Sequence, residues 1–235
     1  MQVMIGCPVR NRAWILPLYL QHLTALSYPP DQVEYCFVIN DSQDETELIL
    51  QEFARLFPVR LLYDNSSRPG GWQRGFYQFS RLAQLRNRLL DAFLQSDCHY
   101  LFSVDSDILV PPHALQQLLQ AGKDMVSALV CNGAEIGDDQ FYNIFNWEND
   151  RLLPIRNFPR NQVFPVDCTG AACLIKRRVI EAGVRYNSSW GPEDIGFCRE
   201  VKKHGFAIFC HGSIECVHVM KPAPNNGFTN QYSLG

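Results

Sequence analysis

The chain has 235 residues, of which 46% are hydrophobic and 19% are charged. This composition is typical of a soluble globular protein, and the length suits a single domain over residues 1–235. The formal net charge is −3 and the basic residues are scattered, which excludes the dense basic surface of a nucleic-acid-binding protein.

Nine cysteines lie along the chain without any Cys-x-x-Cys pair, several of them inside apolar stretches. The odd number and the apolar setting favour buried, reduced thiols in a cytoplasmic protein over a disulfide framework or a zinc site. The first residues are typical of a strand and not of a signal peptide. No apolar run approaches the roughly 18 residues of a membrane-spanning helix, so we expect no transmembrane segment and leave peripheral membrane contact open.

Strand-like and helix-like segments alternate through the first half of the chain. We expect strands over 2–9, 33–40, 59–64, 99–107 and 124–130, and helices over 14–26, 41–57, 76–95 and 113–122. Asp41 or Ser42 is expected to cap the second helix. The alternation predicts an α/β fold, with a mostly parallel sheet and helices on both of its faces. Ligands of such sheets bind beyond the carboxyl ends of the strands, so the residues that follow each strand are the candidates for function.

Regularity is lost over 131–165, which is polar, aromatic and rich in turn residues. We expect a small irregular or antiparallel region there, followed by a strand that leads into a helix. The domain thus divides into 1–130, 131–220 and a tail, 221–235, rich in Pro, Asn and Gly. An earlier loop with Arg68, Trp72 and Arg74 is either a substrate-gated lid or a plain surface connection.

The fourth expected strand ends in two acids, Asp105 and Asp107, one residue apart. Side chains two positions apart on a strand point the same way, so the two carboxylates are expected to converge. Two carboxylates at such a short distance repel each other, and the pKa of one of them rises unless a cation lies between them. Mg²⁺ and Mn²⁺ suit such oxygen ligands and commonly share them with substrate phosphates. Turn capping by aspartate before proline is the alternative interpretation.

The stretch "VDSDILVPP" and the order of the motifs around it resemble the GT-A fold of nucleotide-sugar glycosyltransferases. The similarity is to family 2 and to the Anp1-like and collagen-galactosyltransferase-like groups. "CPVRNRAWILPLYLQHLTALSYP" is similar to the family's first strand, turn and helix, and "VINDSQDET" to its acidic turn. "LAQLRNRLLD" resembles a helix with an Arg-Asn pair near the nucleotide, and "WGPEDIGFCREVKKHG" resembles the Glu-Asp element. The resemblance covers about residues 1–220.

This resemblance implies a divalent metal, Mn²⁺ or Mg²⁺, held against the diphosphate of the donor. It implies metal ligands at Asp107, Asp105 and His218, and nucleotide contacts at Pro8, Val9, Arg10, Asn11, Asp41, Arg86, Asp105 and Ser106. Gly170 lies in a turn of small residues that would let the backbone approach the donor sugar. His211 competes with His218 as the histidine ligand, and a structural role is the alternative for a lone histidine.

The same resemblance makes Asp194 the catalytic base, with Glu193 positioning the acceptor or the base. The chemistry requires such a group, because an alcohol that attacks an anomeric carbon must lose a proton to a carboxylate within hydrogen-bond reach. "GPED" is also typical of a helix start, with proline first and acids favoured by the helix dipole. The two roles are compatible.

We therefore expect a metal-dependent glycosyltransferase that moves a sugar from a UDP- or GDP-sugar to a hydroxyl of a glycan, protein or small molecule. Attack assisted by Asp194 would invert the anomeric centre. Residues 1–130 would bind the donor and 131–220 the acceptor. Two alternatives stay open. One is a nucleotidyltransferase on a similar sheet, which usually has a glycine-rich basic loop that "CPVRNR" lacks, and the other is a binding module without turnover.

Overall fold

The computed structural model describes residues 1–65, 79–133 and 137–221. Arg68, Trp72 and Arg74, named above as part of a candidate lid, lie outside these described residues. The strands are β1 (Val3–Val9), β2 (Val33–Ile39), β3 (Val59–Tyr63), β4 (Tyr100–Val104), β5 (Ile108–Leu109), β6 (Met125–Val130), β7 (Ile144–Glu148), β8 (Arg151–Pro154), β9 (Val163–Val166), β10 (Cys168–Thr169), β11 (Ala172–Lys176) and β12 (Ile208–His218). The helices are α1 (Leu16–Thr24), α2 (Thr46–Ala54), α3 (Phe79–Leu94), α4 (Ala114–Gln120), α5 (Arg177–Glu181) and α6 (Glu193–Lys203), with a 3₁₀ turn at Pro30–Gln32.

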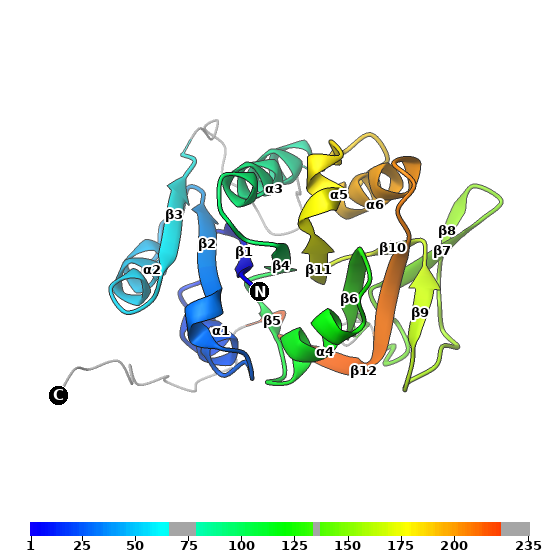
Figure 1. The fold of residues 1–235 in the computed structure, drawn as a ribbon, viewed down its shortest axis with the longest axis horizontal. Helices are drawn as coiled ribbons and strands as arrows, with labels where there is room; N and C mark the ends of the chain where they lie inside the picture. Colours follow the sequence, from blue (N-terminus) through cyan, green and yellow to red (C-terminus); the bar gives the residue numbers. More distant parts are fainter. Residues whose placement is uncertain (66–78, 134–136, 222–235) are drawn as a thin grey trace.

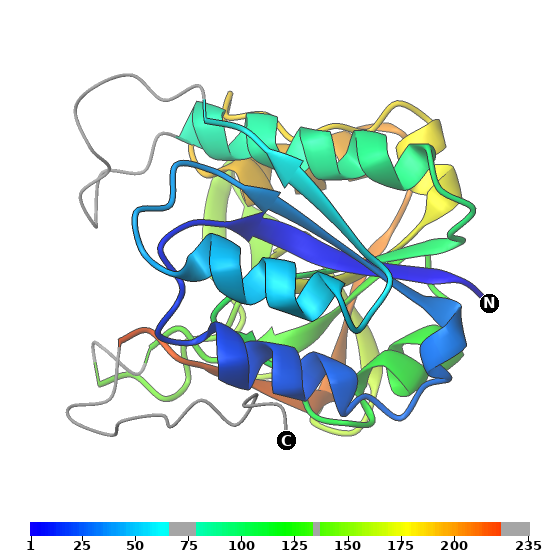
Figure 2. The same ribbon diagram turned by 90° about the vertical axis from the view of Figure 1, so that its left-hand side faces the viewer.

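The central sheet runs in the order β3-β2-β1-β4-β11-β6-β12-β5, and β9 adds to it beside β12. The pairs β2–β3, β1–β2, β1–β4 and β6–β12 are parallel. β11 is antiparallel to both of its neighbours, β4 and β6. Helices α1, α2 and α4 cover one face, and α3, α5 and α6 cover the other (Figure 1; Figure 2). The predicted mostly parallel α/β sheet is confirmed.

Each face of the sheet packs against its own layer of buried side chains. β1 supplies both layers, because Ile5 points into the layer with Leu20 of α1, and Met4 points into the layer with Phe93 of α3 and Phe197 of α6. A strand buried on both faces reads as a continuous apolar run, which is why the central strands were visible in the sequence. All nine cysteines are free, as predicted, and eight of them are buried.

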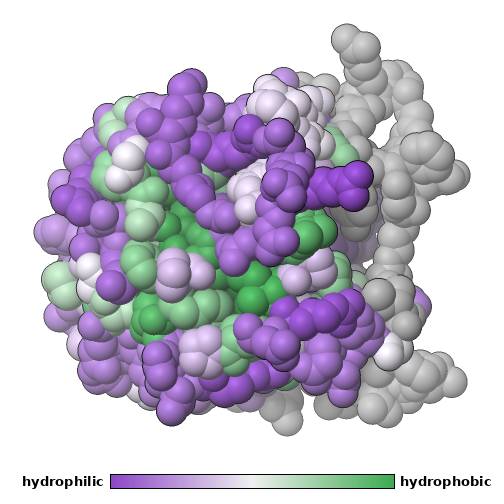
Figure 3. All heavy atoms as spheres, turned by 90° about the vertical axis from the view of Figure 1, so that its right-hand side faces the viewer, coloured by the Kyte–Doolittle hydropathy of each residue, from purple (hydrophilic) through white to green (hydrophobic). Residues whose placement is uncertain are grey.

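The irregular region predicted over 131–165 contains an antiparallel hairpin. β7 pairs with β8 and with β10 in a separate three-stranded sheet, and β9 pairs antiparallel with β12. On this side of the molecule apolar atoms gather in a central band bordered by polar ones (Figure 3). Among the described residues, no helix is long and apolar enough to cross a membrane.

The start of the second helix differs from the prediction. α2 begins at Thr46, so the expectation that Asp41 or Ser42 caps it was wrong. The backbone N–H of Thr46 donates to Oδ1 of Asp44 at 3.1 Å, and Asp41 lies earlier, in a left-handed conformation with φ 45°. The residues between β2 and α2 form a turn that contacts the turn after β1, and this contact delays the helix.

Candidate active site

Two turns meet at the carboxyl edge of the sheet, one after β1 and one after β2. Oδ1 of Asn11 accepts a hydrogen bond from the N–H of Gln43 at 2.8 Å, and the N–H of Asn11 donates to Oγ of Ser42 at 3.2 Å. The N–H of Arg12 donates to Oγ1 of Thr46 at 2.7 Å. Asn11 has φ 48°, a left-handed conformation that asparagine adopts more readily than most residues. The two turns therefore fix one another.

Most residues predicted to contact the nucleotide lie in or beside these turns. Val9 is buried at the end of β1, where its carbonyl accepts from the N–H of Asn40 at 3.2 Å. Pro8 and Arg10 are half-buried on either side of it. Burial lowers the pKa of Arg10, and the carboxylate of Asp41 opposes that shift. The edge thus places an arginine and an aspartate together, and their contact with a nucleotide stays a prediction.

The two acids after β4 each face a different arginine. Oδ1 of Asp105 lies 2.8 Å from Nη2 of Arg86, and Oδ2 of Asp107 lies 3.0 Å from Nη2 of Arg12. Ser106 between them is buried. Burial raises the pKa of Asp107, Arg12 opposes the shift and Asp105 adds to it. The two carboxylates interact, as their spacing predicts, and the guanidinium groups offset their repulsion.

Arg86 on α3 joins the acids after β4 to the acids at the start of α6. Its Nε lies 2.9 Å from Oε1 of Glu193 and 4.0 Å from Oδ1 of Asp194. The side chain is only 5% exposed. Burial alone would lower the pKa of Arg86, but Asp105, Asp194 and Glu193 outweigh it and hold the pKa well above its ordinary value. Arg86 is therefore charged and lies among three carboxylates.

The first turn of α6 presents one buried and one partly exposed acid. Pro192 stands at the N-cap, and Glu193 and Asp194 fill the first turn, where the helix dipole favours acids. Glu193 is 4% exposed, whereas the side chain of Asp194 is 32% exposed. Removal from water raises the pKa of Asp194 to about 7; Glu193 and Asp105 add to the shift and Arg86 opposes it. Asp194 therefore has the pKa and the access of a general base near neutrality.

Gly170 lies directly beneath the carboxylate of Asp194. A Cβ at this position would come within 2.4 Å of Oδ2 and 2.9 Å of Cγ of Asp194. The absence of a side chain is therefore what lets the carboxylate occupy its place. The sequence predicted that Gly170 leaves room for the donor sugar, and the observed neighbour is the candidate base.

The variant Gly170→Ala is expected to lower kcat about 100-fold with little change in the KM for the donor. The new methyl group would push the Asp194 carboxylate aside, and a displacement of about 1 Å at a reacting group has a cost of that order. Steady-state kinetics with varied donor measures both constants, and a thermal unfolding curve verifies the fold. A raised donor KM with unchanged kcat would assign Gly170 to the sugar instead.

His218, at the end of β12, lies beside Asp107. Its Nε2 is 3.8 Å from Oδ1 of Asp107, and its Nδ1 is 3.1 Å from Oδ1 of Asn132. Its two ring nitrogens thus face different groups, Nδ1 an amide and Nε2 a carboxylate. His211 pairs with Ala128 and lies farther back on the strand, where its Nδ1 is 3.0 Å from Oγ of Ser213. Of the two candidate histidines, the fold brings His218 to the acids.

The acids of this region outnumber the arginines that face them. The carboxylates of Asp105, Asp107, Glu193 and Asp194 face the guanidinium groups of Arg12 and Arg86, which leaves a formal charge of −2 when all four acids are ionised. A cation beside Asp107 would be attracted by this excess negative charge. Within the described residues no group of three or more His, Cys, Asp or Glu side chains is arranged to hold a metal. Phosphate and water oxygens usually complete such a site.

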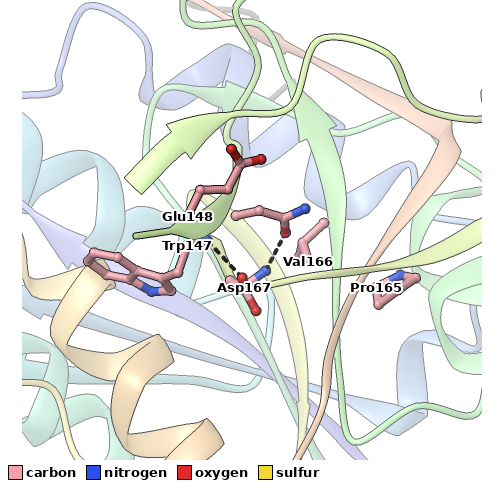
Figure 4. Close-up of a pocket in the computed structure, with 6 residues that line it drawn as sticks. Trp147, Glu148, Pro165, Val166 and Asp167 are labelled. Carbon is pink, nitrogen blue, oxygen red and sulfur yellow. Dashed lines mark hydrogen bonds between the residues drawn. The ribbon is translucent and has the colours of Figure 1, made fainter. Parts of the chain in front are cut away.

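A cavity of about 400 Å³ lies on the hairpin side and is lined by Asn146, Trp147, Glu148, Pro165, Val166 and Asp167 (Figure 4). Asp167 is engaged there, since its carboxylate accepts from the N–H of Trp147 at 2.7 Å and pairs with Lys202. Lys202 is in the last turn of α6 and Asp194 in the first, roughly 12 Å apart along the helix. None of the four acids lines this cavity.

Two residues of the site were given no role in the sequence prediction. Arg12 lies among the residues after the first strand that were candidates for function, but no role was assigned to it, because its partner Asp107 is 95 residues away. Asn132 comes two residues after β6, and the rule that ligands gather beyond strand ends could have found it.

Comparison with known proteins supports one family. The profile described as "Glycosyl transferase family 2" matches residues 5–183. The anp1 subunit of the mannan polymerase II complex of Schizosaccharomyces pombe is 24% identical over an alignment of 182 residues that covers 66% of this chain and 41% of that protein. The multifunctional procollagen lysine hydroxylase and glycosyltransferase LH3 of Rattus norvegicus is 21% identical over 229 residues, 89% of this chain and 28% of that protein. The chain spans less than half the length of either relative.

Solved structures share the fold at low identity. GalNAc-T7 with UDP, GalNAc and Mn²⁺ superposes with a TM-score of 0.69 at 15% identity, over 93% of this chain and 44% of that one. The mannosyltransferase PcManGT of Pyrobaculum calidifontis, in complex with GDP-Man and Mn²⁺, gives a TM-score of 0.60 at 16% identity, over 97% and 58%. The GT-A fold expected from the motif order is confirmed.

Proposed function

The chain belongs to glycosyl transferase family 2, and from that membership and the geometry above we propose that it transfers a sugar from a nucleoside-diphosphate sugar to a hydroxyl acceptor. The observation that carries the proposal is the position of Arg86. Its guanidinium pairs with Asp105 after β4 and with Glu193 and Asp194 at the start of α6, which supports a site shared by a donor-binding acid and the base.

The donor is proposed to be a UDP- or GDP-sugar bound at the carboxyl edge of the sheet. UDP and GDP-Man occur in the complexes of the structural neighbours, which supports this class of donor. Pro8, Val9, Arg10, Asn11, Asp41 and Ser106 would line the nucleotide side. The fixed double turn supports this role, because a preformed site loses little freedom on binding.

The proposed metal ligands are Asp107 and His218, with Asp105 directed at the metal shell or the ribose. Mn²⁺ in the neighbours' complexes supports a divalent ion, and the charge balance around Asp107 fits either Mn²⁺ or Mg²⁺. When bound, such an ion neutralises the negative charge that develops on the leaving diphosphate. Asn132 would hold the imidazole of His218 through Nδ1, leaving Nε2 to bind the ion.

The proposed base is Asp194. Its carboxylate would accept the proton of the acceptor hydroxyl as that oxygen attacks the anomeric carbon and the bond to the diphosphate breaks. Attack in line with the departing group inverts the anomeric centre, and NMR of the glycoside product would report the configuration. Glu193, buried and bound to Arg86, would fix the first turn of α6 and with it the direction of Asp194.

Activity is expected to rise with pH through a region near 7 and to level off above it. Burial raises the pKa of Asp194 to about 7, and only its ionised form accepts a proton. The raised pKa therefore makes the base inactive below this region and active above it. The pH profile of kcat/KM tests this for the free enzyme. A flat profile between pH 5.5 and 8.5, or one that falls with rising pH, would contradict the assignment.

The products separate this function from its alternatives. UDP- and GDP-sugars would be incubated with the protein, Mn²⁺ and a panel of hydroxyl acceptors, and phosphorus NMR would follow the nucleotides. Release of a nucleoside diphosphate is the expected result. Pyrophosphate would indicate a nucleotidyltransferase instead, and donor binding without any release would indicate a binding module.

A further inference from the structure

Arg12 is hydrogen-bonded to the carboxylate of Asp107, which the proposed function assigns to a metal. Nη2 of Arg12 is 3.0 Å from Oδ2 of Asp107, while Oδ1 of the same carboxylate faces Nε2 of His218 at 3.8 Å. The Asp107 side chain is 16% exposed, and its Oδ2 is hydrogen-bonded to Arg12. A cation that takes Asp107 as a ligand competes with the guanidinium of Arg12 for the same charge.

The backbone of Arg12 is held in place, so its side chain can change partner without a change of fold. Its N–H donates to Oγ1 of Thr46, and its carbonyl accepts from the N–H groups of Ile15 and Leu16 at 2.9 Å each. Its neighbour Asn11 is bonded to the turn after β2. The guanidinium thus extends from a fixed point in the turn before α1 toward Asp107, between β4 and β5.

The guanidinium is incompletely bonded in this conformation. Within the described part of the chain, Nε of Arg12 is buried and has no hydrogen-bond partner. The side chain as a whole is 33% exposed, so its outer nitrogens reach solvent. Breaking a single hydrogen bond to Asp107 frees the group, and a planar fork of donors is suited to phosphate oxygens.

We propose that Arg12 has two alternating partners: Asp107 in the ligand-free protein and the diphosphate of the donor once a divalent cation binds Asp107. This inference rests on the proposed function, because it requires that Asp107 binds a metal. Arg12 stabilises the buried carboxylate in the absence of the cation, and the exchange places a second positive charge beside the leaving group when the cation arrives. Arg12 is then a donor-binding residue that also sets the affinity for free metal.

The variant Arg12→Gln is expected to change two affinities in opposite directions. Without nucleotide, the variant should bind Mn²⁺ about tenfold more tightly than the wild type, since a charge-assisted hydrogen bond corresponds to about that factor in an equilibrium constant. With saturating Mn²⁺, it should bind nucleoside diphosphates about tenfold more weakly. Paramagnetic resonance of free Mn²⁺ measures the first affinity, and titration calorimetry measures the second. A purely structural role for Arg12 would weaken both.

Arg60→Gln is the matched control. This substitution removes the same charge from a side chain that is 34% exposed. Arg60, however, pairs with Glu34 at 3.1 Å, between β3 and β2. Both of its affinities should equal those of the wild type. Arg12→Lys, which keeps the charge but not the fork, should retain weak Mn²⁺ binding and recover only part of the diphosphate affinity.

The outcomes separate this inference from the proposed function. Equal Mn²⁺ affinities of wild type and Arg12→Gln, with Asp107→Asn weaker than both, would overturn the exchange of partners and leave the metal site intact. If wild type and Asp107→Asn bind Mn²⁺ with equal affinity, the metal site and the inference are overturned together. The same follows if neither wild type nor Arg12→Gln binds Mn²⁺.

Discussion

The variant Asp194→Asn is expected to lower kcat by about 10²- to 10⁴-fold with the affinity for the donor unchanged. The amide has the shape of the carboxylate but cannot accept the proton of the acceptor hydroxyl. Its neutral group also avoids the cost of burying a charge, which together with the repulsion from Glu193 and Asp105 outweighs the attraction to Arg86, so the fold should keep or gain stability. Release of nucleoside diphosphate measures the rate, and titration calorimetry measures donor binding.

Asp167→Asn is the control for this variant. Asp167 is 23% exposed, pairs with Lys202 and lies at the opposite end of α6 from Asp194. The same chemical change there should leave kcat within about twofold of the wild-type value, because Asp167 takes no part in the reaction. An Asp194→Asn protein that turns over at the rate of the wild type would remove Asp194 as the base.

The variant Arg86→Met is expected to lower the free energy of unfolding by about 3–5 kcal/mol. Its guanidinium is 5% exposed and bonds Glu193, which is equally buried, so removing it leaves a carboxylate without its compensating charge. A second change, Glu193→Gln, should restore part of the loss, because the two residues act as one unit. Urea denaturation of the single and double variants gives these free energies.

Arg88→Met on the same helix is the matched comparison. Arg88 pairs with Asp64 at 2.8 Å but is 42% exposed, and Asp64, 12% exposed, keeps its ion pair with Arg81, so the loss should be about 1 kcal/mol or less. A loss of similar size in both variants would contradict a special role for Arg86. Full additivity of Arg86→Met and Glu193→Gln would show that their bond is not what stabilises this region.

The order of strands and helices was predictable because each central strand is buried on both faces and each helix on one. β1, β2, β4 and β6 appear in the sequence as apolar runs bounded by turns, and the end of each run marks the edge where ligands bind. That rule directed attention to Asp105 and Asp107 before any contact was known. The exact start of α2 was not predictable, because the contacts of its preceding turn with Asn11 cross 32 residues.

The partners of the site residues could not be predicted from the sequence for the same reason. Arg86 was expected to contact the nucleotide. Its partners in the structure are Asp105, 19 residues away in the sequence, and Glu193, 107 residues away, and nothing in "LAQLRNRLLD" indicates them. A buried arginine and its carboxylates carry no local spacing, since the sheet brings them together. The cytoplasmic location and the division into donor and acceptor halves stay predictions.

The central claim is that Asp107 holds the donor diphosphate through a divalent cation. Titration calorimetry of UDP and GDP into wild type and Asp107→Asn, each with Mn²⁺ and with EDTA, tests it directly. We expect one of the two nucleotides to bind the wild type in Mn²⁺, and this binding to be lost in EDTA and in the variant. Binding of equal strength in all four conditions would contradict the claim.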